Sequence, residues 1–404
     1  MSSPNHLTRE DLISFPLNTH QFINNPYPTY SHIQSIHPVY WNAKRKYRGW
    51  FITGYNEAKT ALKDSRLENR IPLPVMTKKY QHLRKLLTNM LLYKNQMDHI
   101  RIRKIVSKAF SPRRISYYQP YIKNTVHELL EDCTKQRKKT IDIISDFAFP
   151  LTSLVIAKLL GIPEKERHHF RKWAIQLVKT IDLSRSKVDI QKGEYLIERL
   201  MKYFQHLIHE KTNNPDHDLI SLLIKDEQLT EEELIATCIL LVIAGHETTV
   251  NLICNSVYSL LKHPDQLLKL QENPNLIDTA IEEFLRYESP TQLTARIASE
   301  DMELGGKSIK SGEHIYILLG AANRDPNTFY IPDTLDITRK PNPHLSFGHG
   351  AHFCIGASLA RMEAKIALLA LIQQKPNIKL QSDNIQWRRL IGFRALAKLP
   401  VIVD

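Results

Sequence analysis

One long apolar helix, predicted between residues 230 and 261, limits the folds open to this chain more than any other feature. Thr230 and Glu233 form a capping box, a pairing that marks the start of a helix. The helical pattern runs to about Leu261, where His263 and Pro264 end it, so about 31 residues rising about 1.5 Å each make a helix of about 45 Å. Its apolar residues lie on several faces, which places the helix in the protein interior.

Hydrophobic periodicity along the rest of the chain favours further helices and a few short strands. Helical pattern fills most of residues 99–223, with breaks at 111–112, 161–163 and 213–215, and further helices are predicted at 277–287 and from Ala357 onward. Strands are predicted at residues 39–41, 50–55, 293–297, 302–304 and 314–318, and a long loop at 71–75. We therefore expect a single domain over residues 1–404, mainly α with small β-sheets.

The N-terminus and the cysteines indicate a soluble protein. Residues 1–15 mix polar, charged and isolated apolar residues, unlike a signal peptide. The longest apolar run, residues 239–244, is far shorter than the roughly 18 residues needed to cross a bilayer. The four cysteines, Cys133, Cys238, Cys254 and Cys354, are too scattered for a disulfide framework, which fits a reducing compartment. We expect a cytoplasmic protein with no membrane span.

The sequence has an excess of positive charge, with 55 Lys plus Arg against 42 Asp plus Glu, or +13. The excess gathers in short clusters at residues 44–46, 78–79, 84–85, 101–104, 113–114 and 137–139. No zinc-finger spacing, helix-turn-helix signal or aromatic RNA-binding motif accompanies it, so we expect no nucleic-acid partner. Two interpretations stay open: a solvated basic surface, or a surface that attracts acidic proteins.

A glycine-rich segment at residues 347–356 surrounds Cys354, and several usual functions of such a segment can be excluded. Phe353 takes the place of the third glycine of a dinucleotide fingerprint, and no Gly-Lys-Ser/Thr follows, as it would in a phosphate loop. No second cysteine lies at zinc-finger spacing. What remains is a loop that presents Cys354 near the start of a helix, where backbone N–H groups favour a thiolate. Haem iron takes such a thiolate as an axial ligand, although a lone cysteine is more often a small buried hydrophobe.

This segment resembles the cysteine loop of cytochromes P450, in which Phe, Gly, Arg or His, Cys and Gly recur at fixed spacing. Phe347, Gly350, His352, Cys354 and Gly356 fall on that pattern. The resemblance implies the cytochrome P450 fold, a single triangular-prism-like unit whose long buried helix crosses over haem b. It also implies that Cys354 binds the haem iron and that the protein is a monooxygenase.

Within the long helix, residues 244–248 (Ala-Gly-His-Glu-Thr) match a second motif of the family. Gly245 weakens the helix, and the Thr248 hydroxyl can bond back to a carbonyl, so a local opening of the helix is expected here. The resemblance implies that Glu247 and Thr248 relay protons to the site of oxygen chemistry. The alternative role of the threonine is packing in the helix interior.

Two further groups of residues match the family. Glu283 and Arg286, three apart on a predicted helix, resemble its buried ion pair, and Arg339 is the candidate third member. By spacing alone, such a pair is usually a surface ion pair. The resemblance also implies that the haem propionates are bound by His99, Arg103, Arg296 and His352. Many relatives carry Arg at the position of His352. Because a histidine, unlike an arginine, can lose its proton near physiological pH, the charge at this position is expected to depend on pH.

The resemblance covers essentially the whole sequence and is strongest to the branch of the family that serves bacterial biotin biosynthesis, through residues 144–151, 287–296 and 392–396. It implies successive hydroxylations of a long-chain fatty acyl group and cleavage of a carbon–carbon bond in its middle, to give pimeloyl-acyl carrier protein. The implied partners are acyl carrier protein and a flavodoxin or ferredoxin that donates electrons. Acyl carrier proteins and flavodoxins are acidic, which suits the balance of +13.

By the same resemblance, the substrate pocket is expected to include Ala244, Pro290, Thr291, Leu293 and Phe393. Two alternative functions stay open. One is a cytochrome P450 that hydroxylates a free fatty acid or a polyketide. The other is a non-catalytic protein that binds haem or acyl carrier protein, which would tolerate loss of Glu247 and Thr248.

Overall fold

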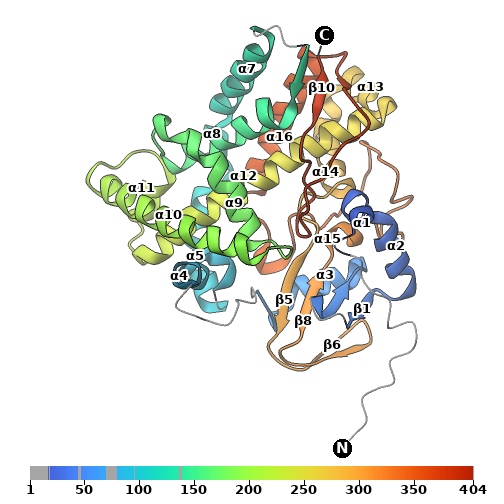
Figure 1. Ribbon diagram of the computed structural model, residues 1–404, viewed down its shortest axis with the longest axis horizontal. Helices are drawn as coiled ribbons and strands as arrows, with labels where there is room; N and C mark the ends of the chain where they lie inside the picture. The colour runs from blue at the N-terminus through green and yellow to red at the C-terminus, as the bar shows by residue number, and fades with distance from the viewer. Residues whose placement is uncertain are drawn as a thin grey trace, which may run out of the picture.

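The computed structural model describes residues 17, 19–43, 47–69, 80–94, 96–135 and 139–403. The N-terminal residues 1–15 and the loop predicted at 71–75 lie outside the described residues, as do the basic residues 44–46, 78–79 and 137–138. In the described part, helices dominate and the strands form small sheets, which confirms the predicted fold class (Figure 1).

Most of the helices lie above the main sheet in the view of Figure 1, and the longest of them, α12, runs among them. The α-helices are α1 (His20–Asn24), α2 (Tyr27–Ile36), α3 (Tyr55–Lys63), α4 (Gln81–Asn89), α5 (Gln96–Ala109), α6 (Pro112–Tyr117), α7 (Gln119–Lys135), α8 (Phe149–Leu160), α9 (Phe170–Ile181), α10 (Lys187–Asn213), α11 (Leu219–Ile224), α12 (Glu231–Lys262), α13 (Pro264–Glu272), α14 (Ile277–Tyr287), α15 (Leu319–Ala322) and α16 (Ala357–Gln374). Short 3₁₀ segments are η4 (Leu91–Tyr93), η6 (Glu164–His169), η7 (Pro274–Leu276) and η8 (Gly350–His352), and η5 (Ile143–Ala148) is π-helical.

The main sheet lies beside α1 to α3, at the lower end of the molecule in Figure 1. Its strand order is β1-β2-β8-β5-β3, with β2 and β8 parallel and the other pairs antiparallel. These strands are β1 (Val39–Asn42), β2 (Gly49–Ile52), β3 (Leu67–Glu68), β5 (Thr294–Ala298) and β8 (His314–Ile317). The smaller sheets contain β4 (Thr140–Asp142), β9 (Lys379–Leu380) and β10 (Pro400–Ile402), and β6 (Met302–Leu304) with β7 (Lys307–Ile309).

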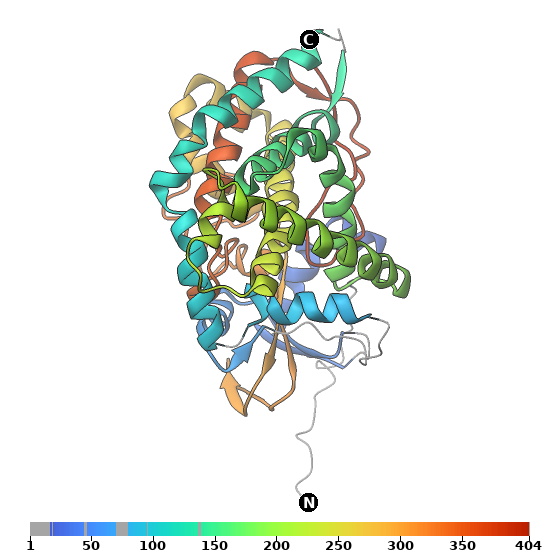
Figure 2. The same ribbon diagram turned by 90° about the vertical axis from the view of Figure 1, so that its left-hand side faces the viewer.

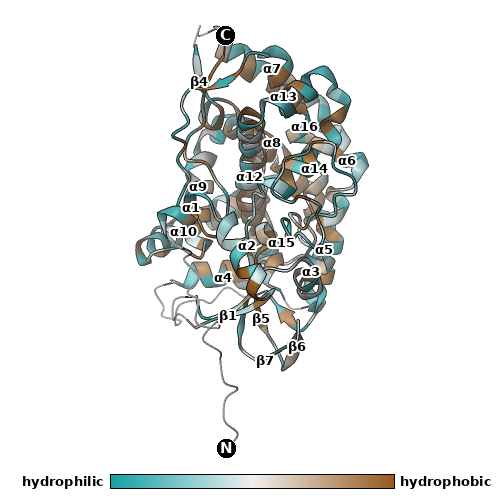
Figure 3. Ribbon diagram, turned by 90° about the vertical axis from the view of Figure 1, so that its right-hand side faces the viewer, coloured by the Kyte–Doolittle hydropathy of each residue, from teal (hydrophilic) through white to brown (hydrophobic). Residues whose placement is uncertain are grey.

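The long helix α12 begins and ends where the sequence predicts. The Glu233 backbone N–H donates to the Thr230 hydroxyl at 3.2 Å, and the Thr230 N–H donates to the Glu233 carboxylate at 3.2 Å. The helix ends at Lys262, two residues before Pro264. It runs through the middle of the molecule (Figure 2), where apolar residues gather (Figure 3). Length and composition would let residues 231–262 and 143–160 cross a membrane, but 78% and 72% of their apolar windows are buried inside this fold. Burial therefore accounts for their apolar character.

The sequence analysis missed several short elements. Strand β4 is short and forms because Ile141 pairs with Val401 of β10. Strand β7 was also missed, although the two residues between β6 and β7, Gly305 and Gly306, have φ of 56° and 71° and suit a tight hairpin. The π-helical turn η5 precedes α8 and is capped by the Asp142 side chain, which accepts from the Ile144 N–H.

Candidate haem-binding site

Cys354 lies at a cavity of about 320 Å³ between α12 and the loop that leads into α16. The predicted site residues that line this cavity are His99, Arg103, Ala244, Thr248, Pro290, Thr291, Arg296, His352 and Cys354. They come from α5, α12, β5 and the two connecting segments before β5 and α16. Folding therefore brings most of the predicted site to one place.

The loop before α16 is held by its own backbone. Gly348 and Gly350 have φ of 72° and 73°, a left-handed conformation that favours glycine. The Cys354 N–H donates to the Phe347 carbonyl at 2.8 Å, and the Phe353 N–H donates to the Gly350 carbonyl at 3.1 Å. These bonds fix Cys354 two residues before Gly356, the N-cap of α16.

Opposing effects act on the pKa of Cys354. Burial raises the pKa of the thiol, while the Gly356 backbone N–H and the positive charges of Arg103 and Arg361 lower it. The side chain is open to the cavity, where a ligand can reach it. A metal cation at the sulfur would add a further charge that favours the thiolate.

The four donors predicted for the haem propionates face the same cavity. Arg296 on β5 is only 3% exposed, and burial lowers its pKa to about 10. The Arg103 guanidinium donates to the Phe353 carbonyl, and the ring centroids of His99 and His352 lie 4.1 Å apart. Among the described residues, no carboxylate pairs with Arg103 or Arg296. A buried cation, Arg296, and a half-buried one, Arg103, without anions suit a ligand that brings carboxylates of its own.

His352 lies among the other predicted propionate donors, and their charges act on its ring. Burial and then the positive charges of Arg296, His99 and Arg103 lower its pKa to about 3. These cations therefore favour the neutral ring in the protein alone. Its Nδ1 lies 3.1 Å from the Asn69 side-chain nitrogen. Carboxylates placed beside the ring would raise its pKa again.

One face of α12 forms a wall of the cavity, and the sequence analysis found only part of it. Ala244 and Thr248 were predicted, while Thr237, Leu240 and Leu241, one and two turns earlier on the same face, were missed although helical spacing places them there. The Thr248 hydroxyl donates to the Ala244 carbonyl at 2.7 Å, as expected. The helix stays α-helical throughout this stretch, so the expected local opening is not seen.

Glu247 does not line the cavity, in contrast to Thr248. Its side chain is only 2% exposed and its carboxylate contacts the Arg388 guanidinium, which comes from the C-terminal segment. Burial raises the pKa of Glu247, and Arg388 acts against that shift. The sequence analysis missed Arg388, because residues 141 positions apart share no local pattern.

Leu293 and Phe393, two of the residues predicted for the substrate pocket, lie outside the cavity lining. Leu293 is 6% exposed and packs in a separate hydrophobic cluster with Phe51 and Tyr316. Phe393 forms a β-bridge with Thr291, and a small neighbouring cavity includes it instead. The prediction placed both segments near the site, but it could not tell which side chains point inward.

Comparison with known proteins decides the family, since residues 12–384 match the cytochrome P450 family. The protein is a cytochrome P450. It is 53% identical to the biotin biosynthesis cytochrome P450 of Bacillus subtilis, over 95% of this chain and 98% of the relative. It is 38% identical to the polyketide biosynthesis cytochrome P450 PksS of the same organism, over 94% and 96% of the two chains. A crystal structure of P450BioI in complex with acyl carrier protein ligated to hexadec-9Z-enoic acid matches with a TM-score of 0.92 and 53% identity, and covers 95% of this chain and 100% of that chain.

Cytochromes P450 are monooxygenases that carry haem b through a cysteine thiolate, so the predictions of family, enzyme class and cofactor are confirmed. The cavity fits that group, because its lining contains Cys354 and the cations Arg103 and Arg296, which pair with no carboxylate among the described residues. The cysteines Cys133, Cys238 and Cys254 are buried away from it.

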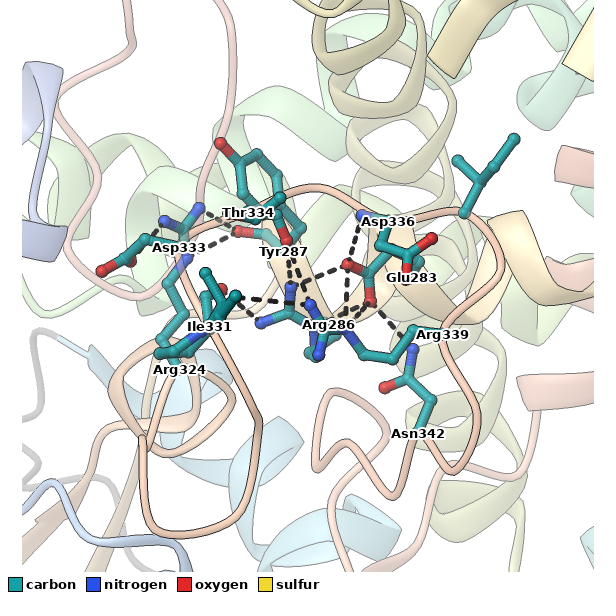
Figure 4. A network of polar contacts seen from close by, with 12 residues as sticks. Glu283, Arg286, Tyr287, Arg324, Ile331, Asp333, Thr334, Asp336, Arg339 and Asn342 are labelled. Carbon is teal, nitrogen blue, oxygen red and sulfur yellow. Dashed lines mark hydrogen bonds and ion pairs between the residues drawn. The ribbon is translucent and has the colours of Figure 1, made fainter. Parts of the chain in front are cut away.

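In this cytochrome P450, the predicted ion pair is part of a buried network of polar contacts (Figure 4). Arg286 and Glu283, both on α14 and fully buried, are joined at 2.8 Å, and Arg339 reaches Glu283 at 3.1 Å. Arg286 also donates to the carbonyls of Asn323, Pro332 and Thr334. The structure thus brings the three predicted residues together. The ion pair between Glu283 and Arg286 lies in the protein core, whereas the spacing alone suggests a pair on the surface.

This network reaches the cysteine loop through Asn323. The Asn323 amide oxygen accepts from the Leu345 N–H at 2.7 Å, and its amide nitrogen donates to the Ser346 hydroxyl at 2.8 Å. Ser346 donates in turn to the Leu285 carbonyl of α14. The backbone entering the loop at Phe347 is therefore tied to the same helix as the ion pair.

Glu363 is a further lining residue that the sequence analysis missed. It is 1% exposed on α16, and neither of its carboxylate oxygens has a hydrogen-bond partner among the described residues. Burial raises the pKa of Glu363 well above its ordinary value, which favours the neutral carboxyl. The sequence did hold a signal for this residue: Glu363 is an acidic residue in an apolar stretch of α16, nine positions after Cys354.

Proposed function

We propose that this cytochrome P450 cleaves a carbon–carbon bond in the middle of a long-chain fatty acyl group on acyl carrier protein, by successive hydroxylations, and so forms pimeloyl-acyl carrier protein for biotin synthesis. The proposal is carried by the 53% identity, over nearly the whole sequence, to a biotin biosynthesis cytochrome P450. The apolar face of α12, with Leu240, Leu241 and Ala244, suits an acyl chain. We further infer a single catalytic domain over residues 1–404 that works in the cytoplasm.

In this proposal, Cys354 is the axial ligand of the haem iron, and His99, Arg103, Arg296 and His352 hold the propionates. Bound haem b supplies the activation of O2, with electrons from a flavodoxin or ferredoxin. The protein's own task is to hold a bent acyl group so that carbons far from both ends reach the oxidising centre. Thr248 faces that centre and can pass a proton from its hydroxyl, while Glu247 lies behind it on the same helix.

We expect Thr248→Ala to bind haem and substrate normally but to divert most reducing equivalents to hydrogen peroxide. The reason is that the hydroxyl that orders the last step of proton delivery is lost, an effect of about 10²-fold or more in general acid–base catalysis. The measurement is hydrogen peroxide formed and product formed per NADPH consumed.

Glu247→Gln should slow turnover and change the solvent isotope effect, because a carboxyl that exchanges protons is replaced by an amide that does not. Thr249→Ser, at the next position of α12, is the matched control and should keep coupling. Full coupling and rate in Thr248→Ala and Glu247→Gln would show that the two residues only pack the helix.

The substrate is tested by comparing acyl groups on acyl carrier protein with the same free fatty acids. We expect carrier-bound acyl groups to bind more tightly and to give pimeloyl-acyl carrier protein, identified by mass spectrometry. The difference in affinity between carrier-bound and free acyl groups should fall as the salt concentration is raised, because electrostatic attraction between protein surfaces is screened over about 8–10 Å. Equal binding and turnover of both forms at every salt concentration would instead support hydroxylation of a free fatty acid or a polyketide.

A further inference from the structure

A second cavity, of about 500 Å³, lies where the connection between α9 and α10 meets the C-terminal segment 388–391. Its lining contains four cationic side chains, Lys179, Arg185, Arg388 and Arg389. Of the described residues that line it, Asp189 alone carries a carboxylate, and this group accepts hydrogen bonds from the N–H and the hydroxyl of Ser186 at 2.9 and 2.6 Å. We call it the basic cavity, because its positive charges outnumber its negative one.

Two of these cations are available to a ligand. Lys179, in the last turn of α9, and Arg389 are exposed, and neither forms an ion pair with a described residue. Arg185 is half-buried and donates to the carbonyls of Ile181 and Asp182 at 3.3 and 3.2 Å. Burial lowers the pKa of Arg185, so an anion placed beside it would be stabilising.

Arg388 lines the basic cavity and contacts α12, the helix that forms a wall of the haem cavity. One of its guanidinium nitrogens contacts Glu247, whose neighbour Thr248 lines the haem cavity, and its Nη2 is buried without a hydrogen-bond partner among the described residues. The same C-terminal segment also reaches the haem cavity at Phe393, which forms a β-bridge with the lining residue Thr291. Residues 388–393 therefore line the basic cavity at one end and contact the lining of the haem cavity at the other, so the cations lie on a segment that both cavities share.

We propose that the basic cavity binds the phosphodiester group of the prosthetic arm that joins the acyl group to acyl carrier protein. The inference rests on the proposed function, since a carrier-bound acyl group brings one phosphodiester and a free fatty acid brings none. Guanidinium groups bind phosphate oxygens through paired, charge-assisted hydrogen bonds. Holding the arm at a fixed point would set how far the acyl group enters, and therefore which carbon reaches the oxidising centre.

The test uses the haem-loaded protein and two arm analogues that carry the same hexadecenoyl group. Hexadecenoyl-phosphopantetheine has the phosphate, and hexadecenoyl-pantetheine lacks it. Dissociation constants come from the change in the haem spectrum and from calorimetry. We expect the phosphorylated analogue to bind about tenfold more tightly, and this preference to fall to about twofold or less in Lys179→Gln/Arg389→Gln, since two charge-assisted hydrogen bonds are lost.

Lys379→Gln, which removes an exposed cation from β9, is the matched control and should keep the preference. The proposal is overturned if the unmodified protein binds both analogues equally, or if the double variant keeps the full preference. It is also overturned if the double variant binds acyl carrier protein weakly but still prefers the phosphorylated analogue, because the cations would then contact the carrier surface. These outcomes do not depend on turnover of carrier-bound acyl groups, so they separate the basic cavity from the proposed function.

Discussion

Replacing Cys354 with Ser should abolish turnover and remove the red-shifted Soret band that the reduced carbon-monoxide complex of a thiolate-bound haem shows. The band and the activity both depend on electron donation from a thiolate, which a serine hydroxyl does not supply near neutral pH. The loop should keep its shape, because it is held by backbone bonds such as the one from the Cys354 N–H to the Phe347 carbonyl. The measurement is the difference spectrum of the reduced protein, together with haem content.

The other cysteines provide the controls. Cys238 and Cys254 are buried in the hydrophobic core, where each acts as a small apolar side chain. Cys238→Ala and Cys254→Ala should therefore keep the band and lose only stability. A normal band in Cys354→Ser, or its loss in either control with full haem content, would rule out Cys354 as the ligand.

The features that could be predicted from the sequence are those that local chemistry determines. The capping box at Thr230 and the proline after His263 fix both ends of α12, and the glycines around Cys354 fix its loop. His99 and Arg103, four residues apart on one helix face, reach the same cavity wall. The structure of these elements can be predicted because it is determined by residues that are close together in the sequence.

Contacts between distant segments could not be predicted in the same way. Arg388 lies 141 residues from Glu247, and nothing near either residue indicates that they meet. Leu293 and Phe393 lie in the right segments, but their side chains point into other cavities and clusters because the facing of a strand residue depends on register. Glu363 shows its unusual burial only once α16 is packed against α12.

Glu283→Ala should be the most destabilising single change in the network of Figure 4. Glu283 is fully buried and accepts from Arg286, Arg339, Asn342 and the Asp336 N–H. Its removal leaves two buried or nearly buried guanidinium groups without an anion, and breaking a buried ion pair in this way costs about 3–5 kcal/mol. We expect a matching loss in the free energy of unfolding, measured by urea denaturation.

Haem retention should fall in the same variant, because Arg286 holds the carbonyl of Asn323 and Asn323 holds Leu345 at the entrance to the cysteine loop. Asp278→Ala on the same helix is the matched control: its ion pair with Lys365 at 2.7 Å is exposed, and such pairs contribute about 0–1 kcal/mol. If both variants lose the same small amount of stability and keep their haem, Glu283 does not hold the loop. If Glu283→Ala loses stability but keeps haem, the network supports the core without positioning Cys354.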